Sequence, residues 1–235
     1  MSNKHLSTQF DAELSGISTR VLEMGGTVES QVARAVYALT QFNSDVAAEV
    51  LATEEQVNAM EIEIDRDLSS IIARRQPTAR DLRLLIAISK TIANLERVGD
   101  EAARIARTVQ RLINAGVSSR LRLPVNDLVH ESELAVAQLR KALDAFARLD
   151  VDKAVEVLKS DDLIDQEFEG LIRKLITFMM EDPRTISSSI DLVFVGKAIE
   201  RVGDHAKNLA EQVIYIVKGT DVRHNSLGTI ETLVR

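Results

Sequence analysis

The sequence predicts an all-α fold made of two tandem three-helix bundles, and three observations lead to this prediction. The 235-residue chain is 45% hydrophobic and 28% charged, as in an ordinary soluble globular protein. Only three prolines and ten glycines interrupt it, so long helices are expected. The third observation is an internal repeat, because segments of the first half recur about 104–107 residues later.

Turn and capping residues divide the chain into six expected helices. Pro77 disfavours helix at the preceding residue, and Thr78 is a suitable cap for the helix that follows. The other breaks are 43–45, the Gly- and Ser-containing stretch 114–124, a milder turn near Asp150, and 182–184. We therefore expect helices over 9–42, 44–75, 79–114, 126–149, 151–181 and 186–218, followed by a looser tail.

The repeat keeps its register over a whole three-helix unit. Residues 45–51 match 152–158 at an offset of 107, and Pro77 matches Pro183 at an offset of 106. The pentapeptide E-R-V-G-D stands at both 96–100 and 200–204, at an offset of 104. This pattern indicates duplication of a three-helix unit, with a first bundle over 1–118 and a second over 119–235.

Composition excludes several classes of protein. The chain carries 36 acidic and 29 basic residues, for a formal charge of −7, whereas a general nucleic-acid binder usually shows a basic excess. The lack of cysteine excludes disulfides and thiolate metal sites. The first residues lack the apolar core of a signal peptide. The sequence has no run of 18 apolar residues, so we expect no membrane-spanning helix. A cytoplasmic protein is the simplest interpretation.

The E-R-V-G-D pentapeptide is unfavourable for an isolated helix. A glycine inside a helix costs about 1 kcal/mol relative to alanine, and carboxylates at i and i+4 repel by roughly 0.2–0.5 kcal/mol. Projection at 100° per residue places Val98 and Val202 in the apolar arc and the acidic residues outside it. Gly99 and Gly203 fall at the edge of the arc, where a missing side chain lets a neighbouring helix or a ligand approach.

The outward acidic residues predict a metal site in each bundle. Antiparallel helices rise equally from a short turn, so distances from Pro77 and Pro183 place further acidic residues level with each pentapeptide. Clusters of carboxylate oxygens suit magnesium, manganese or iron, with zinc as a further candidate. The expected ligands are Glu54, Asn58, Glu96 and Asp100 in the first bundle, and Asp161, Asp165, Glu200 and Asp204 in the second. Because Asn58 replaces an acid, we expect tighter binding in the second bundle.

The alternative for these acids is a solvated face paired with nearby basic residues. Such pairing is the common role of acids at i and i+4 on a soluble helix. The basic residues close enough in sequence to provide it are Arg97, Arg104, Arg107 and Arg201.

Other motifs give weaker indications. No Glu-x-x-His is present, although a ferritin-like di-iron enzyme would carry it on two helices. We expect a solvated side chain at His205 and a surface capping role for Asp127 and His130. No phosphate-binding glycine loop occurs, and six Phe, two Tyr and no Trp leave no stacking platform for single-stranded nucleic acid. An arginine corner comprises Arg74, Arg75, Arg80 and Arg83; capping and salt bridges are its default role, and a partner-docking surface is the alternative.

Three sequence features together resemble the PhoU family. They are the doubled E-R-V-G-D, the stretch R-Q-P-T-A-R-D-L-R at 75–83, and Y-x-x-K-G-T-D-V-R-H at 215–224. The resemblance covers about Phe10 to His224. It implies a cytoplasmic, non-catalytic regulator, often a homodimer, that represses the phosphate-starvation response and modulates phosphate uptake. It also implies signal transduction through partners at the inner membrane, namely the ATPase subunit of the phosphate ABC importer and a sensor histidine kinase.

The resemblance further implies surface metal clusters on paired E(D)-x-x-x-D motifs. Carried over to this chain, it covers Asp161, Asp165, Glu200 and Asp204 fully, and Glu54, Glu96 and Asp100 with Asn58 in place of an acid. A metal-dependent carboxylate enzyme, a hydrolase or an oxidase, is the alternative function. The absence of histidine ligands and of a recognisable nucleophile speaks against that alternative.

Overall fold

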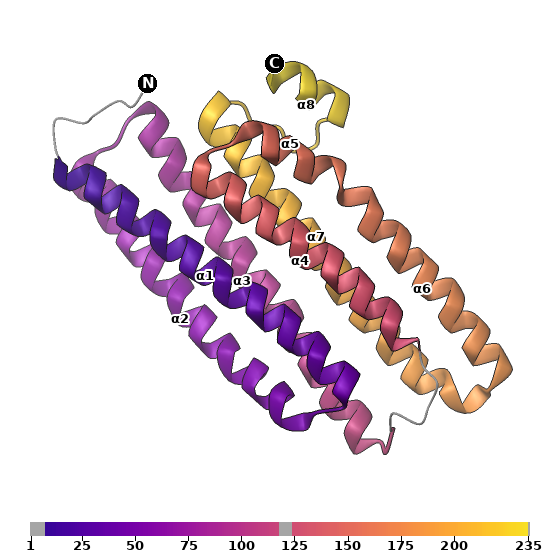
Figure 1. Cartoon of the computed structure of the whole chain (residues 1–235). Coiled ribbons are helices and arrows are strands. Elements are labelled where there is room, and N and C mark those ends of the chain that lie inside the picture. The colour runs from indigo at the N-terminus through magenta and orange to yellow at the C-terminus, as the bar shows by residue number, and fades with distance from the viewer. Residues whose placement is uncertain (1–7, 118–123, 235) are drawn as a thin grey trace.

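The computed structural model describes residues 8–117 and 124–234, and their regular structure is helical. The first bundle consists of α1, α2 and α3, and the second of α4 to α7, with α8 near the C-terminus (Figure 1). The bounds are α1 Thr8–Gln41, α2 Ser44–Arg75, α3 Ala79–Asn114, α4 Val125–Arg148, α5 Val151–Lys159, α6 Asp161–Glu181, η1 Pro183–Thr185, α7 Ile186–Lys218 and α8 Leu227–Val234.

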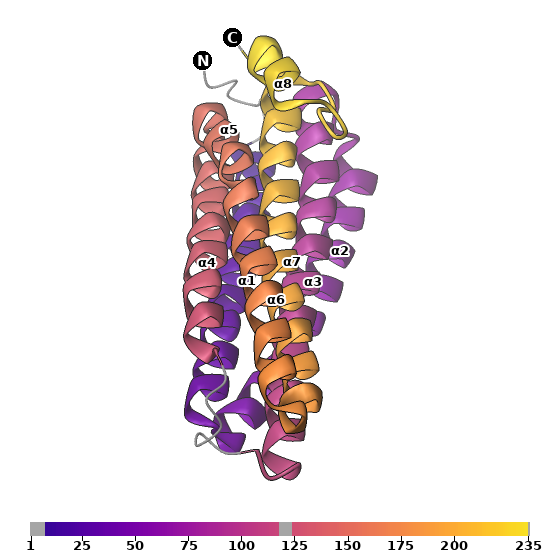
Figure 2. The same cartoon turned by 90° about the vertical axis from the view of Figure 1, so that its right-hand side faces the viewer.

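The two bundles lie side by side with their long helices roughly aligned (Figures 1 and 2). The most extensive interface joins α3 to α7, and α1 also packs on α4. Gly25 of α1 makes this second contact close, because a Cβ there would lie 2.5 Å from a methyl carbon of Leu143. The buried apolar side chains of both bundles therefore form one continuous core. Separate folding of 1–118 and 119–235 stays a prediction, and residues 118–123 at that boundary lie outside the described part of the chain.

The duplication is visible in the first turn of each bundle. Phe42 and Leu149, 107 residues apart, both adopt positive φ, at 48° and 52°. The following Asn43 and Asp150 donate backbone N–H groups to the carbonyls of Ala38 and Ala145 at 2.9 Å in each case. Their side chains then cap the next helix. This agreement supports duplication of a three-helix unit.

The expectation of one continuous helix over 151–181 is wrong, because α5 ends at Lys159 and α6 begins at Asp161. Ser160 Oγ donates to the carbonyl of Val157, three residues earlier, at 2.9 Å. At the matching position of α2, Thr53 donates to Glu49, four residues earlier, and the helix continues. A short polar side chain that competes for backbone carbonyls explains the break. The other expected helices are confirmed to within one residue at each end.

Candidate functional site

The glycine of each E-R-V-G-D motif admits a glutamine from the neighbouring helix. Gln31 Nε2 donates to the carbonyl of Val50 at 3.1 Å, and Gln138 Nε2 donates to the carbonyl of Val157 at 3.2 Å. A Cβ on Gly99 or Gly203 would lie 3.2 Å from the Oε1 atom of the respective glutamine. The close helix approach expected at both glycines is therefore confirmed. Besides the glutamine, a Cβ would meet Val57 at Gly99, at 3.3 Å, and Ile164 at Gly203, at 2.7 Å.

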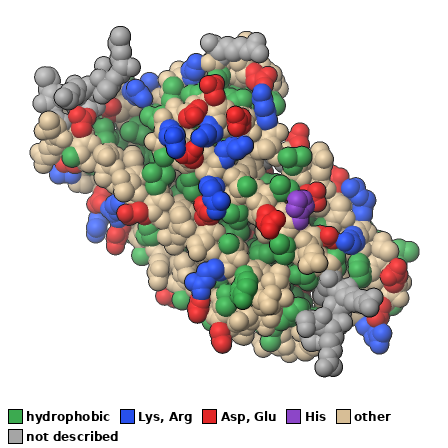
Figure 3. Space-filling model, viewed as in Figure 1, with side chains coloured by type: hydrophobic (Ala, Val, Ile, Leu, Met, Phe, Trp, Pro, Cys, Tyr) green, Lys and Arg blue, Asp and Glu red, His purple; other side chains and the backbone are tan. Residues whose placement is uncertain are grey.

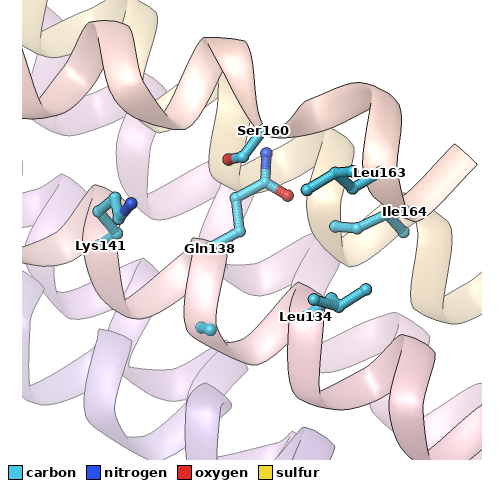
Figure 4. Close-up of a pocket in the computed structure, with 7 residues that line it drawn as sticks. Leu134, Gln138, Lys141, Ser160, Leu163 and Ile164 are labelled. Atoms are coloured by element: carbon cyan, nitrogen blue, oxygen red, sulfur yellow. The ribbon is translucent and has the colours of Figure 1, made fainter.

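Gln138 also borders a small hollow beside the break in the second bundle. The hollow has a volume of about 130 Å³ and lies between α4 and the start of α6. Gln138 extends from α4 toward the turn at Ser160, and Lys141 lies further along the same helix (Figure 4). None of the expected metal ligands lines the hollow.

In the first bundle, the acids that influence one another are not all those expected. Burial raises the pKa of Glu96, and Asp100 and Glu61 raise it further, while Glu54 contributes least. Burial also raises the pKa of Glu61, with added effects from Asp65 and Asp100. The sequence analysis missed Glu61 and Asp65, although E-I-E-I-D at 61–65 has the same E-x-x-x-D spacing.

Glu54 and Asn58 both lie on α2, and Glu54 has a basic partner on α3. Arg107 Nη2 donates to both carboxylate oxygens of Glu54, at 2.7 and 2.8 Å. Asn58 is half-buried on α2, one turn further along. The pairing alternative thus holds for Glu54, whereas Arg104 and Arg201 pair with the buried Glu101.

In the second bundle, Glu200 is half-buried and lies 2.6 Å from Lys197 Nζ. Asp165 and Asp204 are exposed on α6 and α7, and Asp161 is the first residue of α6. Asp161 and Asp165 thus belong to α6, and Glu200 and Asp204 to α7.

A further acid, Glu131 of α4, was missed by the sequence analysis. It is 1% exposed, and neither of its carboxylate oxygens has a hydrogen-bond partner among the described residues. Burial raises its pKa to about 9, with smaller effects from Glu200 and Glu167. The signal was available in the repeat, because Glu131 stands 107 residues after the buried Met24.

The acids of both bundles offer oxygen donors that suit hard cations. Burial is the main cause of the raised pKa values of Glu61 and Glu96, and neighbouring carboxylates add to it. Among the described side chains, however, no three acidic or histidine residues surround a common point as metal ligands. Metal coordination by the expected residues stays a prediction.

The arginine corner divides into structural and exposed members. Arg75 forms a two-point salt bridge with Glu13 of α1, at 2.8 and 3.0 Å, which lowers the pKa of Glu13. Arg83 is half-buried, and its guanidinium packs against Gly219 at the end of α7. Arg74 and Arg80 are exposed. A docking role for the corner stays a prediction.

The expectation that His205 is solvated is wrong. It is 8% exposed, and its Nδ1 lies 3.0 Å from Asn94 Oδ1 of α3. Burial lowers its pKa to about 4, helped by the positive charges of Arg201 and Arg97. The projection of α7 considered packing within one bundle, whereas His205 faces the other bundle.

Asp127 and His130 of α4 both have partners on α6. Asp127 accepts a hydrogen bond from Lys174 Nζ at 2.7 Å, and His130 Nε2 lies 4.0 Å from Glu167 Oε1.

The surface carries charges of both signs. On the face shown in Figure 3, basic and acidic side chains interleave with apolar ones, and no broad basic area is visible. Over the described residues, every helix is too short or too polar to cross a lipid bilayer.

Known proteins resemble this chain over almost its full length. The model of the PhoU domain matches twice, at residues 21–109 and 128–213. A Burkholderia protein named phosphate-specific transport system accessory protein PhoU homolog is 48% identical over 226 residues, covering 96% of each chain. The Escherichia coli (strain K12) protein of the corresponding name is 46% identical, covering 94% of this chain and 90% of its own.

Solved structures agree with the sequence comparisons. The crystal structure of PhoU from Pseudomonas aeruginosa is 45% identical, with a TM-score of 0.83, and covers 90% of this chain and 100% of its own. The phosphate transport system regulatory protein PhoU from Streptococcus pneumoniae is 26% identical, also with a TM-score of 0.83, and covers 91% and 99%. Both E-R-V-G-D motifs lie inside the matched domains, at equivalent places in α3 and α7. The chain therefore belongs to the PhoU family, with two PhoU domains in tandem.

Proposed function

We propose that this protein is a regulatory accessory protein of a phosphate-uptake system. The observation that carries the proposal is the nearly end-to-end match, at 48% and 46% identity, to proteins named for that role. The PhoU domain matches in both halves of the chain, so the whole double bundle is available for the same task.

In its finer form, the proposal makes the protein a cytoplasmic negative regulator of the phosphate-starvation response. It would act as a homodimer that bridges the ATPase subunit of a phosphate ABC importer and a sensor histidine kinase. The exposed Arg74 and Arg80 are candidates for such contacts, because arginine is favoured where carboxylates are recognised at interfaces.

The regulatory proposal is tested by deleting the gene and measuring alkaline phosphatase in phosphate-rich medium. We expect high expression in the deletion strain and restored repression by the wild-type chain. An Arg74→Ala, Arg80→Ala double variant should restore repression less well, and Arg184→Ala, at the corresponding corner of the second bundle, is its control. Full repression in the deletion strain would contradict the regulatory role.

The bridging and dimer proposals need separate measurements. Affinity purification from phosphate-replete cells should recover the importer ATPase and the kinase together with the tagged chain. Light scattering on the purified protein should give twice the 26.0 kDa chain mass. Recovery of neither partner, or a monomeric mass, would contradict the respective statement.

We also propose that divalent or iron-type metal ions bind the paired acidic motifs. The crowding of Glu61, Glu96 and Asp100 supports this, because a cation would relieve their mutual repulsion. Elemental analysis and calorimetry after chelator treatment test it. Glu96→Gln and Glu61→Gln should each weaken binding in the first bundle, whereas Asn58→Asp should strengthen it. Unchanged metal content in all three variants would contradict the assignment.

The alternative of a metal-dependent hydrolase or oxidase gains no support from the described side chains. They show no arrangement of three acidic or histidine residues around a common point. A turnover screen on the metal-loaded protein would reveal such an activity if it existed.

A further inference from the structure

A polar hollow lies between the two bundles, where α3 packs on α7. It consists of two adjoining parts that share His205, Asn208, Glu211 and Arg223. The part of about 360 Å³ is lined by both bundles, and the part of about 720 Å³ is lined by α7 and the segment after it. We call it the inter-bundle hollow. Its charged lining comprises Lys90, Arg97, Arg201, Lys207 and Arg223, against the carboxylates Asp204 and Glu211. Five basic side chains face two acidic ones in this lining, and two of the five, Arg201 and Arg223, already pair with Glu101 and Asp221.

The hollow has an ordered polar floor that requires both bundles. Asn94 of α3 accepts a hydrogen bond from Asn208 Nδ2 of α7 at 3.0 Å, and His205 Nδ1 lies at the same distance from the same oxygen. Asn94 Nδ2 in turn donates to the carbonyl of Lys90 at 2.8 Å. These bonds fix three polar side chains in place, which favours recognition of a small polar ligand over a loose surface contact.

Two basic side chains of the hollow lack an ion-pair partner among the described residues. Lys90 is half-buried, its Nζ lies 5.5 Å from the centre of the Tyr215 ring, and its charge reaches Asp221 only through space. Arg97 is exposed, and its charge reaches Glu61, Glu96 and His205 only through space. Their donors are therefore available to an anion.

The internal repeat shows how Arg97 differs from its counterpart in the second bundle. The offset of 104 relates Arg97 to Arg201, and Glu101 to His205. On one side of the α3–α7 interface, Arg201 Nη1 binds Glu101 Oε1 at 2.8 Å. On the other side, His205 stands at the position that corresponds to Glu101, so Arg97 lacks the counterpart of the carboxylate that binds Arg201. An anion from solution would supply the missing charge.

The hollow also offers a hydrogen-bond acceptor. Glu211 lines both parts and is 8% exposed. A carboxylate beside an anion site repels any ligand that cannot donate a proton to it. At neutral pH inorganic phosphate carries an acid proton and sulfate carries none, whereas a phosphate monoester, with a second pKa of about 6, is largely deprotonated.

We propose that the inter-bundle hollow binds inorganic phosphate, with Lys90 and Arg97 donating to its oxygens and Glu211 accepting from its acid proton. The ligand would touch both bundles at once and would stabilise their present arrangement by mass action. This inference concerns binding by the purified chain, so it stands or fails independently of the regulatory role.

The test is isothermal titration of the full chain with phosphate after chelator treatment, which removes any metal that would bind phosphate itself. A solution at about pH 8 favours the ionised form of Glu211, whose pKa is raised by burial. We expect phosphate to bind, and sulfate and adenosine monophosphate to bind at least about tenfold more weakly. No heat of binding with phosphate, or tighter binding of the monoester, would overturn the proposal.

Variants locate the site. Lys90→Ala and Arg97→Ala should each weaken phosphate binding by about tenfold, because each removes a charge-assisted hydrogen bond. Arg184→Ala is the matched control, since Arg184 is an exposed arginine of η1, just before α7, and its partner is Asp182. Glu211→Gln should let sulfate bind nearly as well as phosphate. Unchanged affinity in both basic variants would overturn the location, and unchanged rejection of sulfate in Glu211→Gln would overturn the role of that acid.

Discussion

The two bundles share their packing framework and differ in the polar groups attached to it. In both, a glutamine passes a helix glycine to reach a carbonyl of the neighbouring helix, at 3.1 Å from Gln31 and 3.2 Å from Gln138. Yet the first bundle buries Met24 where the second buries Glu131. After duplication, each helix crossing still constrained its own residues. Divergence nevertheless reached a buried position, because Met24 and Glu131 are both almost inaccessible to solvent.

The two bundles also differ in the salt bridge at the turn before their last long helix. In the first, Arg75 reaches across to Glu13 of α1 and joins two helices. In the second, Arg184 pairs with Asp182 of its own turn. One salt bridge is tertiary and the other local, so only the first can hold helices together.

The largest expected effect comes from making the second bundle resemble the first at Glu131. Its pKa is raised to about 9 in the folded protein, so it keeps a proton that the unfolded chain releases above its ordinary pKa. Stability should therefore fall with rising pH between these values, by up to about 1.4 kcal/mol per pH unit. Glu131→Met should remove this slope and stabilise the protein by about 2–4 kcal/mol near pH 8.

Urea unfolding of both proteins at about pH 5 and pH 8 measures this effect. Glu131→Gln is the control, because it keeps a polar side chain and cannot titrate. A stability difference between wild type and Glu131→Met that is equal at both pH values would contradict the buried, protonated carboxylate.

The next effect concerns the shared framework. Gly99→Val and Gly203→Val should each destabilise the protein by about 2–3 kcal/mol, because the added methyl groups displace the buried glutamine. Gly26→Ala, in α1, is the control: nothing lies within 4 Å of a Cβ there, so it should stabilise by about 0.5–1 kcal/mol. Thermal unfolding compares the three. Tolerance of valine at one glycine but not the other would show that the two crossings are not equivalent.

The smallest stability effect separates the two corners. Arg75→Ala should lower the melting temperature, since it leaves the partly buried Glu13 without its main partner. Arg184→Ala should leave the melting temperature nearly unchanged. Equal shifts in differential scanning fluorimetry would mean that the tertiary salt bridge adds nothing beyond a local one.

Much of this framework could be predicted from the sequence. The helix bounds follow from the turn residues. The glycine of each E-R-V-G-D motif could be predicted to lie at a close helix contact, because a larger side chain does not fit there. The break at Ser160 was missed because one serine rarely ends a helix, and here its hydroxyl competes for a backbone carbonyl. Glu61 was missed although it forms an E-x-x-x-D pair with Asp65 in the sequence.

Other features depended on how the bundles meet. His205 was placed in solvent because a projection of α7 identifies the face toward its own bundle, and not the face toward α3. The hollow beside it combines residues of α3, α7 and the segment after α7, which no single helix pattern brings together.

The central claim is that divergence at one position of a duplicated interface opened an anion site. The direct test is His205→Glu, which gives α7 the carboxylate that α3 has at Glu101. The new carboxylate should pair with Arg97 as Glu101 pairs with Arg201. Calorimetry on chelator-treated protein should show phosphate affinity lower by about tenfold or more, with the fold retained by circular dichroism. Phosphate affinity equal to that of the wild type would contradict the claim.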